Sequence, residues 1–479
     1  WSKVRSIGEP VGDVGQTSGV IPFIRVQDAN TLAISQGSLR RGSSAAYLDI
    51  SHPEIEEFLE IRKPSGDANR KALNIHHGVT IPDDFMYAVK HDDQWDLISP
   101  KTGNVVKSVS ARALWEKILR MRIQTGEPYI LFSDTVNANR PAHVKKLGME
   151  ITQSNLCSEI TLPTGVDYLG NERTAVCCLS SLNLEKYDEW NDNGLFIKDV
   201  FKFLDDVLSD FIARTDGAQG FERARYSAEM ERSVGLGMMG WHSYCQKMNF
   251  PLESLASKIA NRNISQHVRQ MADKVNVELA AERGACPDAQ AAGEEKRFSH
   301  MMAIAPTASI SIICGGTSAG IEPIPANIYT HKTLSGSFTV KNKRLQELLA
   351  DKGKDDRDVW ESILANEGSV QHLDFLTDDE KAIYKTAFEI DQRWIVDLAA
   401  DRAPFIDQAV SNNLFFPGNV DVRDLHFTHW VAWERGVKSL YYCRSRAVQR
   451  AEKISHFAGE MPNNNVPARL DYEECLVCQ

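Results

Sequence analysis

Three residues that could do chemistry alternate in the segment QSNLCSEITLP, residues 153–163. Asn155 offers an amide, Cys157 a thiol and Glu159 a carboxylate. In an extended chain every second side chain points to the same face, so these three would project together. A thiol between an amide and a proton-accepting carboxylate suits redox or nucleophilic chemistry. The neighbouring carboxylate tends to raise a thiol pKa, which argues against a resting thiolate. The alternative is a buried cysteine beside a surface glutamate.

Four further cysteines lie in two pairs. Cys177 and Cys178 are adjacent, and such residues usually pack separately because a vicinal disulfide is strained. Cys475 and Cys478 form a CxxC dithiol in an aperiodic end segment that contains Pro and Asn. A dithiol on a mobile arm is an exchange device, whereas the alternative is a disordered end with incidental cysteines. Zinc is disfavoured because no second CxxC accompanies either pair.

A small, hydroxyl-rich loop follows the apolar run MMAIA at 301–305. The loop begins PTASI, residues 306–310, and a turn of this kind exposes backbone N–H groups that can bind an anion. It matches neither the P-loop nor the dinucleotide-binding fingerprint. An ordinary connection between a strand and a helix is the alternative.

Two other segments carry polar groups in suggestive positions. The segment 34–47 combines glycines with Arg40 and Arg41, as in a loop that orders around a nucleotide, or simply a solvated basic turn. Tyr441 and Tyr442 follow an apolar run near the end of the chain. Two such tyrosines are normally core residues, and their functional interpretation is a redox-active pair.

Helical and extended patterns alternate along the chain. Helices are expected over 51–63, where Ser51 and Glu54 form a capping box, and over 111–122, 201–212 and 269–284. Apolar runs of strand length occur at 19–26, 129–134, 301–305 and 438–442. Buried strands that alternate with helices predict an α/β fold with much parallel sheet.

Composition limits the function classes. The 479 residues are 25% charged and carry a formal net charge of −11, which gives no support for nucleic-acid binding. We find no signal-peptide pattern and no apolar run of about 18 residues. The odd total of nine cysteines favours a reducing cytosol over a secreted disulfide framework. We therefore expect a cytoplasmic protein. The start WSKVRSIGEP lacks Met, which predicts a processed product or part of a longer polypeptide.

Taken together, these motifs resemble the large, catalytic subunit of class I ribonucleotide reductase, from near residue 1 to Gln479. On that resemblance NLCSE is the finger loop, whose Cys157 becomes a thiyl radical and abstracts the ribose 3′ hydrogen. Glu159 is the base on the 3′ hydroxyl. Asn155 positions the sugar hydroxyls, and Ser154 also contacts substrate.

The resemblance assigns the other motifs too. The pattern CxLxSxNL aligns Cys177, not Cys178, with one member of the reducing pair. The tyrosine pair relays the radical from a partner subunit, and the tail dithiol re-reduces the active-site disulfide. The remaining implied residues bind phosphates (Pro306, Thr307, Ala308, Ser309 and Ile310) or effector (Arg5, Gln36 and Arg40).

The resemblance also implies an architecture and partners. The family fold is a ten-stranded α/β barrel, here expected over 1–455, with a flexible redox tail over 456–479. The radical comes from a diiron or related dimetal tyrosyl radical in a small subunit, so this chain should hold no metal. ATP and deoxynucleotides are effectors, thioredoxin or glutaredoxin the reductant, and the chain is expected to form homo-oligomers.

One departure concerns the N-terminal region of the family. Its first barrel strand bears the second reducing cysteine, and nothing in this chain matches it, so a companion fragment is expected to supply that strand. Alternatives are an adenosylcobalamin-dependent reductase, which the adjacent tyrosines disfavour, a non-catalytic nucleotide-binding paralogue, and a thiol–disulfide relay.

Overall fold

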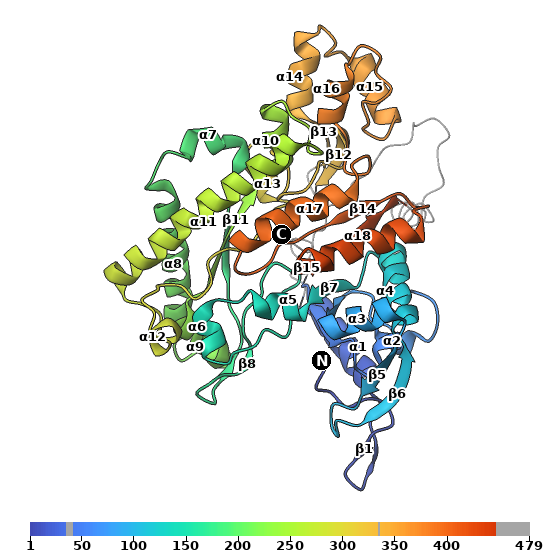
Figure 1. The fold of residues 1–479 in the computed structure, drawn as a ribbon, viewed down its shortest axis with the longest axis vertical. Coiled ribbons are helices and arrows are strands. Elements are labelled where there is room, and N and C mark those ends of the chain that lie inside the picture. The colour runs from blue at the N-terminus through green and yellow to red at the C-terminus, as the bar shows by residue number, and fades with distance from the viewer. Residues whose placement is uncertain (35–41, 334–335, 447–479) are drawn as a thin grey trace.

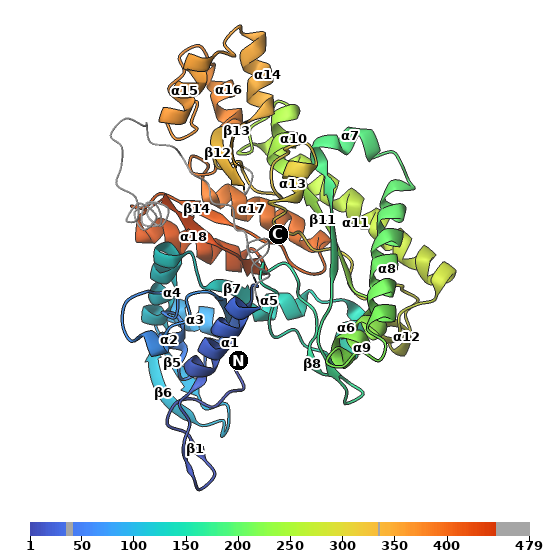
Figure 2. The same ribbon diagram turned by 180° about the vertical axis from the view of Figure 1, so that it is seen from behind.

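The computed structural model describes residues 1–34, 42–333 and 336–446. Figures 1 and 2 show an N-terminal part containing α1 to α4 and a middle part containing α8 and α11. Helices α17 and α18 run across the centre, and a small lobe of α14 to α16 projects at one end. None of the described helices combines the length and apolar character needed to cross a membrane.

A four-stranded sheet forms the centre of the N-terminal part. Strands β3 (Ala45–Asp49), β4 (His76–Ile81) and β7 (Tyr129–Phe132) pair in parallel, and β15 (Ser439–Leu440) adds to β7 antiparallel. All residues of β4 and β7 are buried, as expected for parallel strands covered on both faces. The sheet thus joins segments more than 300 residues apart in sequence.

The other parallel strands lie in the middle and C-terminal parts. Strand β10 (Cys178–Asn183) pairs with β11 (Val234–Met239), and β14 (Leu414–Phe416) pairs with β16 (Cys443–Ser445). Isolated parallel bridges join Leu236 to Met302 and Ile304 to Val410. Within the described residues the strands form separate sheets, and most of the pairing between distant strands is parallel.

Helices cover these strands. Their bounds are α1 (Val20–Ala33), α2 (Ile55–Phe58), α3 (Asp83–His91), α4 (Ala111–Thr125), α5 (Ser133–Ala138), α6 (Ala142–Lys146), α7 (Tyr187–Trp190), α8 (Phe196–Arg214), α9 (Glu222–Glu231), α10 (Trp241–Lys247), α11 (Leu255–Arg283), α12 (Pro287–Ala291), α13 (Ile310–Ile313), α17 (Gln392–Arg402) and α18 (Val422–Glu434). Short 3-10 helices are η1 (Ala68–Arg70), η2 (Leu184–Lys186) and η3 (Ala403–Phe405).

Peripheral hairpins and the lobe complete the molecule. The hairpins are β1 (Pro10–Val11) with β2 (Gly15–Gln16), β5 (Gln94–Ile98) with β6 (Val105–Ser110), β8 (Gly165–Val166) with β9 (Glu172–Arg173), and β12 (Ile328–Thr333) with β13 (Gly336–Lys341). The lobe consists of α14 (Lys343–Asp351), α15 (Arg357–Ala365) and α16 (Asp378–Ile383). It has a hydrophobic core of its own around Leu345, Leu349 and Trp360.

The structure confirms three of the four predicted helices and corrects two elements. Helices α4, α8 and α11 are present, and α4 and α11 end at the predicted glycines. The predicted strand at 19–26 is wrong: it begins α1, whose buried residues follow helical spacing. The capping box at Ser51 is also wrong, because the backbone N–H of Ser51 bonds to Asp49 and only the single turn of α2 forms.

Candidate active site

The segment around Cys157 is a turn, so the extended geometry assumed from its alternation is wrong. The backbone N–H of Ser158 bonds to the carbonyl of Asn155 at 3.3 Å, and Ser158 has a left-handed φ of 66°. A non-glycine residue in this region costs energy unless its surroundings hold it. Here the Tyr47 hydroxyl lies 3.2 Å from Ser158 Oγ, and Ser439 Oγ donates to the Ser158 carbonyl at 2.9 Å. These contacts fix the tip of the loop.

Polar contacts also order the two ends of this turn. The backbone N–H of Ile160 donates to Asn155 Oδ1 at 3.1 Å, and Ser154 Oγ donates to the Ile160 carbonyl at 2.7 Å. Both side chains are half-buried, so each keeps some exposed surface. Asn155 and Ser154 therefore shape the loop, whatever they bind.

The Glu159 carboxyl is buried, with 2% of its surface exposed. Burial raises its pKa, and hydrogen bonds, including those from Asn155 and Ser411, only partly counteract this. Ser411 Oγ lies 3.1 Å from Glu159 Oε2 and donates to the Cys157 carbonyl at 2.6 Å. A carboxyl with a raised pKa is suited to accept a proton during a reaction.

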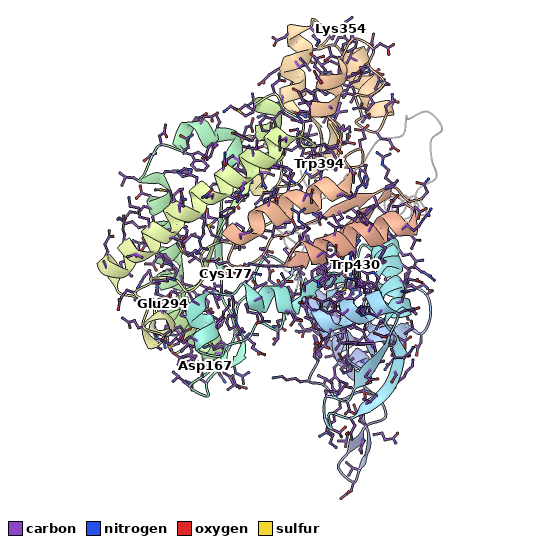
Figure 3. All side chains as sticks on the ribbon, in the orientation of Figure 1. Asp167, Cys177, Glu294, Lys354, Trp394 and Trp430 are labelled. Atoms are coloured by element: carbon purple, nitrogen blue, oxygen red, sulfur yellow. The ribbon has the colours of Figure 1, made fainter. Side chains whose placement is uncertain are left out.

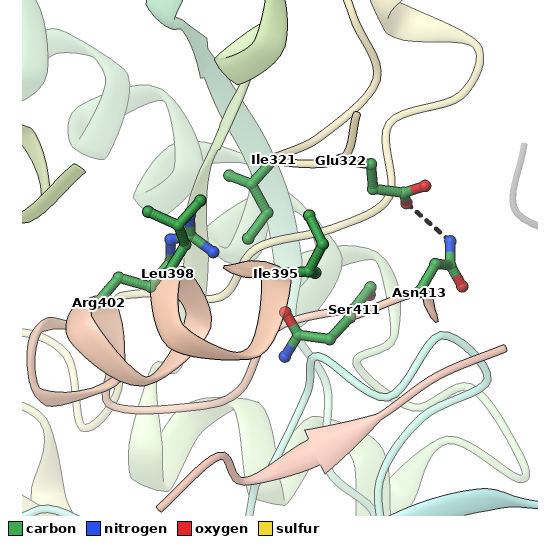
Figure 4. A pocket seen from close by; sticks show the side chains of 8 residues that line it. Ile321, Glu322, Ile395, Leu398, Arg402, Ser411 and Asn413 are labelled. Carbon is green, nitrogen blue, oxygen red and sulfur yellow. Dashed lines mark hydrogen bonds between the residues drawn. The ribbon is translucent and has the colours of Figure 1, made fainter. Parts of the chain in front are cut away.

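One segment, residues 406–411, contacts Cys157, Glu159 and Cys177. Its Ala409 N–H bonds to the Glu159 carbonyl at 2.9 Å, and its Gln408 Nε2 donates to Cys177 Sγ at 3.7 Å. The buried ammonium of Lys438 donates to the carbonyls of residues 406 and 408 at 2.6 and 2.7 Å. Burial lowers the pKa of Lys438 to about 8. Figure 4 shows the small pocket behind this segment, where Asn413 donates to Glu322.

The two adjacent cysteines have different surroundings. Cys177 contacts Gln408, whose amide also bonds the Val234 carbonyl at 3.0 Å, whereas Cys178 packs against the main core. Burial raises the pKa of the Cys177 thiol well above its usual range. Both thiols are free, and Cys177 is labelled in Figure 3. Cys177 thus contacts the segment that also bonds Glu159, and its choice over Cys178 stays a prediction.

The predicted tyrosine pair lies beside Cys157. The Tyr441 hydroxyl donates to Cys157 Sγ at 3.5 Å, and the ring centroids of Tyr441 and Tyr442 are 4.3 Å apart. Tyr441 is buried and Tyr442 half-buried. Tyr129 completes the cluster, with its centroid 4.7 Å from that of Tyr441. A continuous contact thus runs from a half-exposed ring to the thiol.

Strand register explains this convergence. Strand β15 pairs antiparallel with β7, Leu440 opposite Ile130, so the next residues, Tyr441 and Tyr129, meet. The tyrosine pair leaves β15 directly, held by bonds from the Tyr441 N–H to the Asn412 carbonyl and from the Cys443 N–H to the Gly126 carbonyl.

The loop at 306–310 lies next to the same segment. The bridge between Ile304 and Val410 aligns the preceding strand with residues 409–411. In the loop, Thr307 has a left-handed φ of 54° and its hydroxyl accepts the Gly320 N–H at 2.7 Å. Ser309 Oγ is buried without a hydrogen-bond partner among the described residues. Pro306 and Ala308 line a pocket that Tyr441 also lines, so the loop and Tyr441 face one cavity.

Of the remaining predicted residues, only Arg5 belongs to the described part of the chain. Arg5 donates from Nη1 to the Pro10 carbonyl at 3.1 Å, beside the β1–β2 hairpin. Gln36, Arg40, Cys475 and Cys478, like the domain boundary at 455, lie outside the described residues. In the part of the chain that is described, no cluster of three or more His, Cys, Asp or Glu side chains could hold a metal ion.

Sequence reasoning missed the supporting residues of the site. Gln408 and Ser411 touch the reactive groups from far along the chain, Lys438 bonds the backbone beside them, and nothing local in the sequence marks these three. His76 contacts both Glu127 and Tyr442. The adjacent histidines at 76–77, at the start of an apolar strand, were the one signal available.

Comparisons with known proteins agree with this geometry. The family model "Ribonucleotide reductase, barrel domain" matches residues 1–296 and 288–443. The chain is 43% identical over its whole length to a Frog virus 3 (isolate Goorha) protein that carries the name of a ribonucleoside-diphosphate reductase large subunit, and covers 81% of it. Identity to the large subunit of Invertebrate iridescent virus 3 is 41%, with 95% of this chain and 82% of that protein covered.

A solved structure is also similar. The class Id ribonucleotide reductase alpha subunit of Actinobacillus ureae superposes with a TM-score of 0.79 at 35% identity, covering 92% of this chain and 76% of the other. The predicted α/β barrel of the ribonucleotide reductase type is thereby confirmed.

Proposed function

The chain belongs to the ribonucleotide reductase large-subunit family, and from that premise we propose that it reduces ribonucleoside diphosphates to deoxyribonucleoside diphosphates. The observation that carries the proposal is the contact line from Tyr442 through Tyr441 to Cys157, with the Glu159 carboxyl two residues from the thiol. A nucleotide-binding protein without catalytic function needs none of these groups.

Radical entry uses the tyrosine pair. The small subunit would accept one electron and one proton from Tyr442, because its dimetal cofactor would supply the oxidising radical. A Tyr442 radical takes a hydrogen atom from Tyr441, which then takes one from the Cys157 thiol at 3.5 Å. Each step exchanges one hydrogen atom, so no charge accumulates in the buried cluster.

Substrate reduction follows at Cys157. Its thiyl radical removes the ribose 3′ hydrogen, Glu159 accepts the 3′ hydroxyl proton, and the 2′ hydroxyl leaves as water with a proton from one of two reducing thiols. The two thiols supply two electrons and the hydrogen added at C2′, and end as a disulfide. Glu159 then returns its proton to the 3′ oxygen, and Cys157 returns the hydrogen to C3′. Asn155 and Ser154 orient the sugar hydroxyls. Residues 306–310 bind the phosphates, a role that suits the orphaned hydroxyl of Ser309.

Cys177 supplies one of the two reducing thiols. In the family the second thiol lies on a strand that precedes the first effector loop. Cys475 and Cys478 would re-reduce the disulfide, and thioredoxin or glutaredoxin would reduce them in turn. Arg5, Gln36 and Arg40 would bind ATP or deoxynucleotide effectors in a cytoplasmic homo-oligomer.

The test is deoxycytidine diphosphate formation by the full-length protein with its small subunit and a dithiol reductant. Cys157→Ser should abolish product, since a hydroxyl cannot replace the thiyl radical. Cys245→Ser, at a fully buried cysteine in the main core, is the matched control and should retain turnover. Product formation by Cys157→Ser would overturn the radical role of Cys157. Disulfide exchange without any deoxynucleotide product, retained in Cys157→Ser, would favour a thiol–disulfide relay. Loss of activity in Tyr441→Phe, without response to adenosylcobalamin, would exclude the cobalamin-dependent alternative.

A further inference from the structure

A buried ionic cluster lies next to Tyr442, the half-buried member of the tyrosine pair, and has no role in the chemistry above. The Tyr442 hydroxyl lies 3.2 Å from His76 Nδ1, and the same nitrogen contacts Glu127 Oε1. His77 donates to the other carboxylate oxygen from its backbone N–H at 3.0 Å, and its Nδ1 lies 2.9 Å from that oxygen. Glu127 and His77 are completely buried, and His76 is 5% exposed.

Three strand ends bring this cluster together. Gly78 of β4 pairs in parallel with Tyr129 of β7, so two residues earlier His76 lies beside Glu127. Antiparallel β15 then delivers Tyr442 to the same place, where the Cys443 N–H bonds to the Gly126 carbonyl at 2.9 Å. The contact is therefore built by the sheet, not by a loop.

The cluster fixes which atom carries the proton. Burial would raise the pKa of Glu127, but His76, Arg62 and His77 outweigh it and lower that pKa well below the usual range. Glu127 is thus ionised, and its oxygens accept hydrogen bonds from nitrogens that carry a hydrogen. His76 Nδ1 must therefore carry hydrogen, and this single hydrogen is shared between Glu127 Oε1, the nearer acceptor, and the phenolic oxygen of Tyr442.

We propose that His76, oriented by Glu127, is a positioning residue for Tyr442: it donates a hydrogen bond to the phenolic oxygen and holds the ring against Tyr441 during radical transfer. This inference rests on the proposed function for its purpose, but the contact itself does not. A phenol oxygen and a phenoxyl oxygen both accept hydrogen bonds. A donor fixed in advance therefore serves both states without rearrangement.

Other described groups around this pair contact the ring, the backbone or the carboxylate. The Arg444 guanidinium lies over the Tyr442 ring, 4.9 Å from its centroid, and Tyr129 meets the ring edge-on at 5.2 Å. The Asn413 side chain accepts the backbone N–H of Tyr442. Arg62 is 3.9 Å from Glu127 and binds the carbonyls of Leu73 and Ile75. The first three contacts hold Tyr442 in place, and Arg62 offsets the negative charge of Glu127.

The experiment places 3,5-difluorotyrosine at position 442 of the full chain and follows its ionisation by fluorine NMR, because fluorine brings the phenol pKa nearer neutrality. A donor to the ionised oxygen lowers that pKa. His76→Phe should therefore raise the phenol pKa by about one unit, since it removes the donor. His76→Gln, which retains an N–H, should restore much of the difference.

The matched control is His77→Phe, because the His77 ring is equally buried, lies against the same carboxylate and packs edge-on against Phe58. It should leave the pKa within about 0.3 units. An unchanged pKa in His76→Phe, or equal shifts in both variants, would overturn the proposal. These titrations do not require turnover, so they test the contact between His76 and Tyr442 even if the proposed reaction does not occur.

Two further measurements complete the test. The first applies if the His76 variants fold poorly, and the second tests the role of His76 in turnover. Tyr442→Phe in otherwise unchanged protein should move the nitrogen-15 resonance of His76 Nδ1, whereas Tyr441→Phe should not; the reverse result overturns the contact. In the assembled enzyme, His76→Phe should lower kcat at least tenfold with KM unchanged, and His76→Gln should recover activity. A rise in KM alone would contradict a role in radical transfer.

Discussion

Glu159 must be ionised to act as a base, yet its burial favours the protonated form. Its pKa is raised by burial and held down in part by Ser411, whose hydroxyl lies 3.1 Å from Oε2. Turnover should therefore fall as the pH falls through this raised pKa. Ser411→Ala removes a stabilising contact to the carboxylate, so the acidic limb of kcat against pH should move up by about one unit.

A neighbouring serine provides the control for that pH profile. Ser439 Oγ donates to the carbonyls of Ser158 and Val410, each at 2.9 Å, and therefore braces the same loop without contacting the Glu159 carboxyl. Ser439→Ala should lower turnover without moving the acidic limb. Equal shifts in the two variants would mean that loop geometry, and not the Glu159 pKa, sets the limb.

The residues that could be predicted from sequence are those whose chemistry is concentrated locally. Cys157 and Glu159 stand two positions apart, and Tyr441 and Tyr442 are adjacent, so short motifs mark them. The residues that tune them come from elsewhere: Ser411 reaches Glu159 across 252 positions. Such contacts depend on strand pairing, which no local pattern specifies.

Among the elements, the end of α4 positions the tyrosine pair. Gly126 ends the helix with a left-handed φ of 82°, and its carbonyl accepts the Cys443 N–H. A Cβ there would lie 3.5 Å from the Tyr442 ring, an ordinary contact, so the penalty of Gly126→Ala is backbone strain. We expect a loss of about 1–2 kcal/mol in unfolding free energy by urea denaturation, with reduced kcat as the strained turn shifts.

Gly148→Ala isolates the helix-end strain from its effect on the site. Gly148 has a similar φ of 67° just after α6, and a Cβ there meets nothing within 4 Å. Its unfolding free energy should fall by a similar amount while kcat is unchanged. If both variants lost activity alike, the end of α4 would have no special connection to Tyr442.

The strongly periodic helices could be predicted, whereas short or ambiguous runs could not. Helix α4 follows a clear amphipathic pattern bounded by Ser110 and Gly126. The run at 19–26 is apolar enough for either a strand or a helix, and only its burial against the sheet selects α1. Where the helix and strand propensities of a segment are similar, tertiary packing thus selects its structure.

At the scale of the whole molecule, the chain has one main core and a smaller one. The main core extends from Val20 to Cys443 and includes the strands that carry the active site. The core of the lobe lies within residues 328–384. Two cores joined by few elements allow local opening of the smaller one without loss of the larger.

Substituting the central aromatic residue of each core tests this division. Trp360 is 3% exposed in the lobe, and Phe201 is fully buried in the main core. Each change to Ala should cost about 3–5 kcal/mol. By hydrogen exchange, Trp360→Ala should remove protection from α14 to α16 while β4 and β7 keep theirs. Phe201→Ala should reduce protection in β10 and β11 as well as in β4 and β7.

The lobe is nevertheless attached by specific polar bonds, which sharpens the expected result. Asn327 donates from Nδ2 to the carbonyls of Gly368 and Tyr384, and Asn342 donates to Gln246 of α10. These bonds lie next to the pocket that Tyr441 and the 306–310 loop share. If Trp360→Ala deprotected β7 as strongly as α15, the lobe and the barrel would unfold as one unit, and the tyrosine cluster would depend on the lobe for its rigidity.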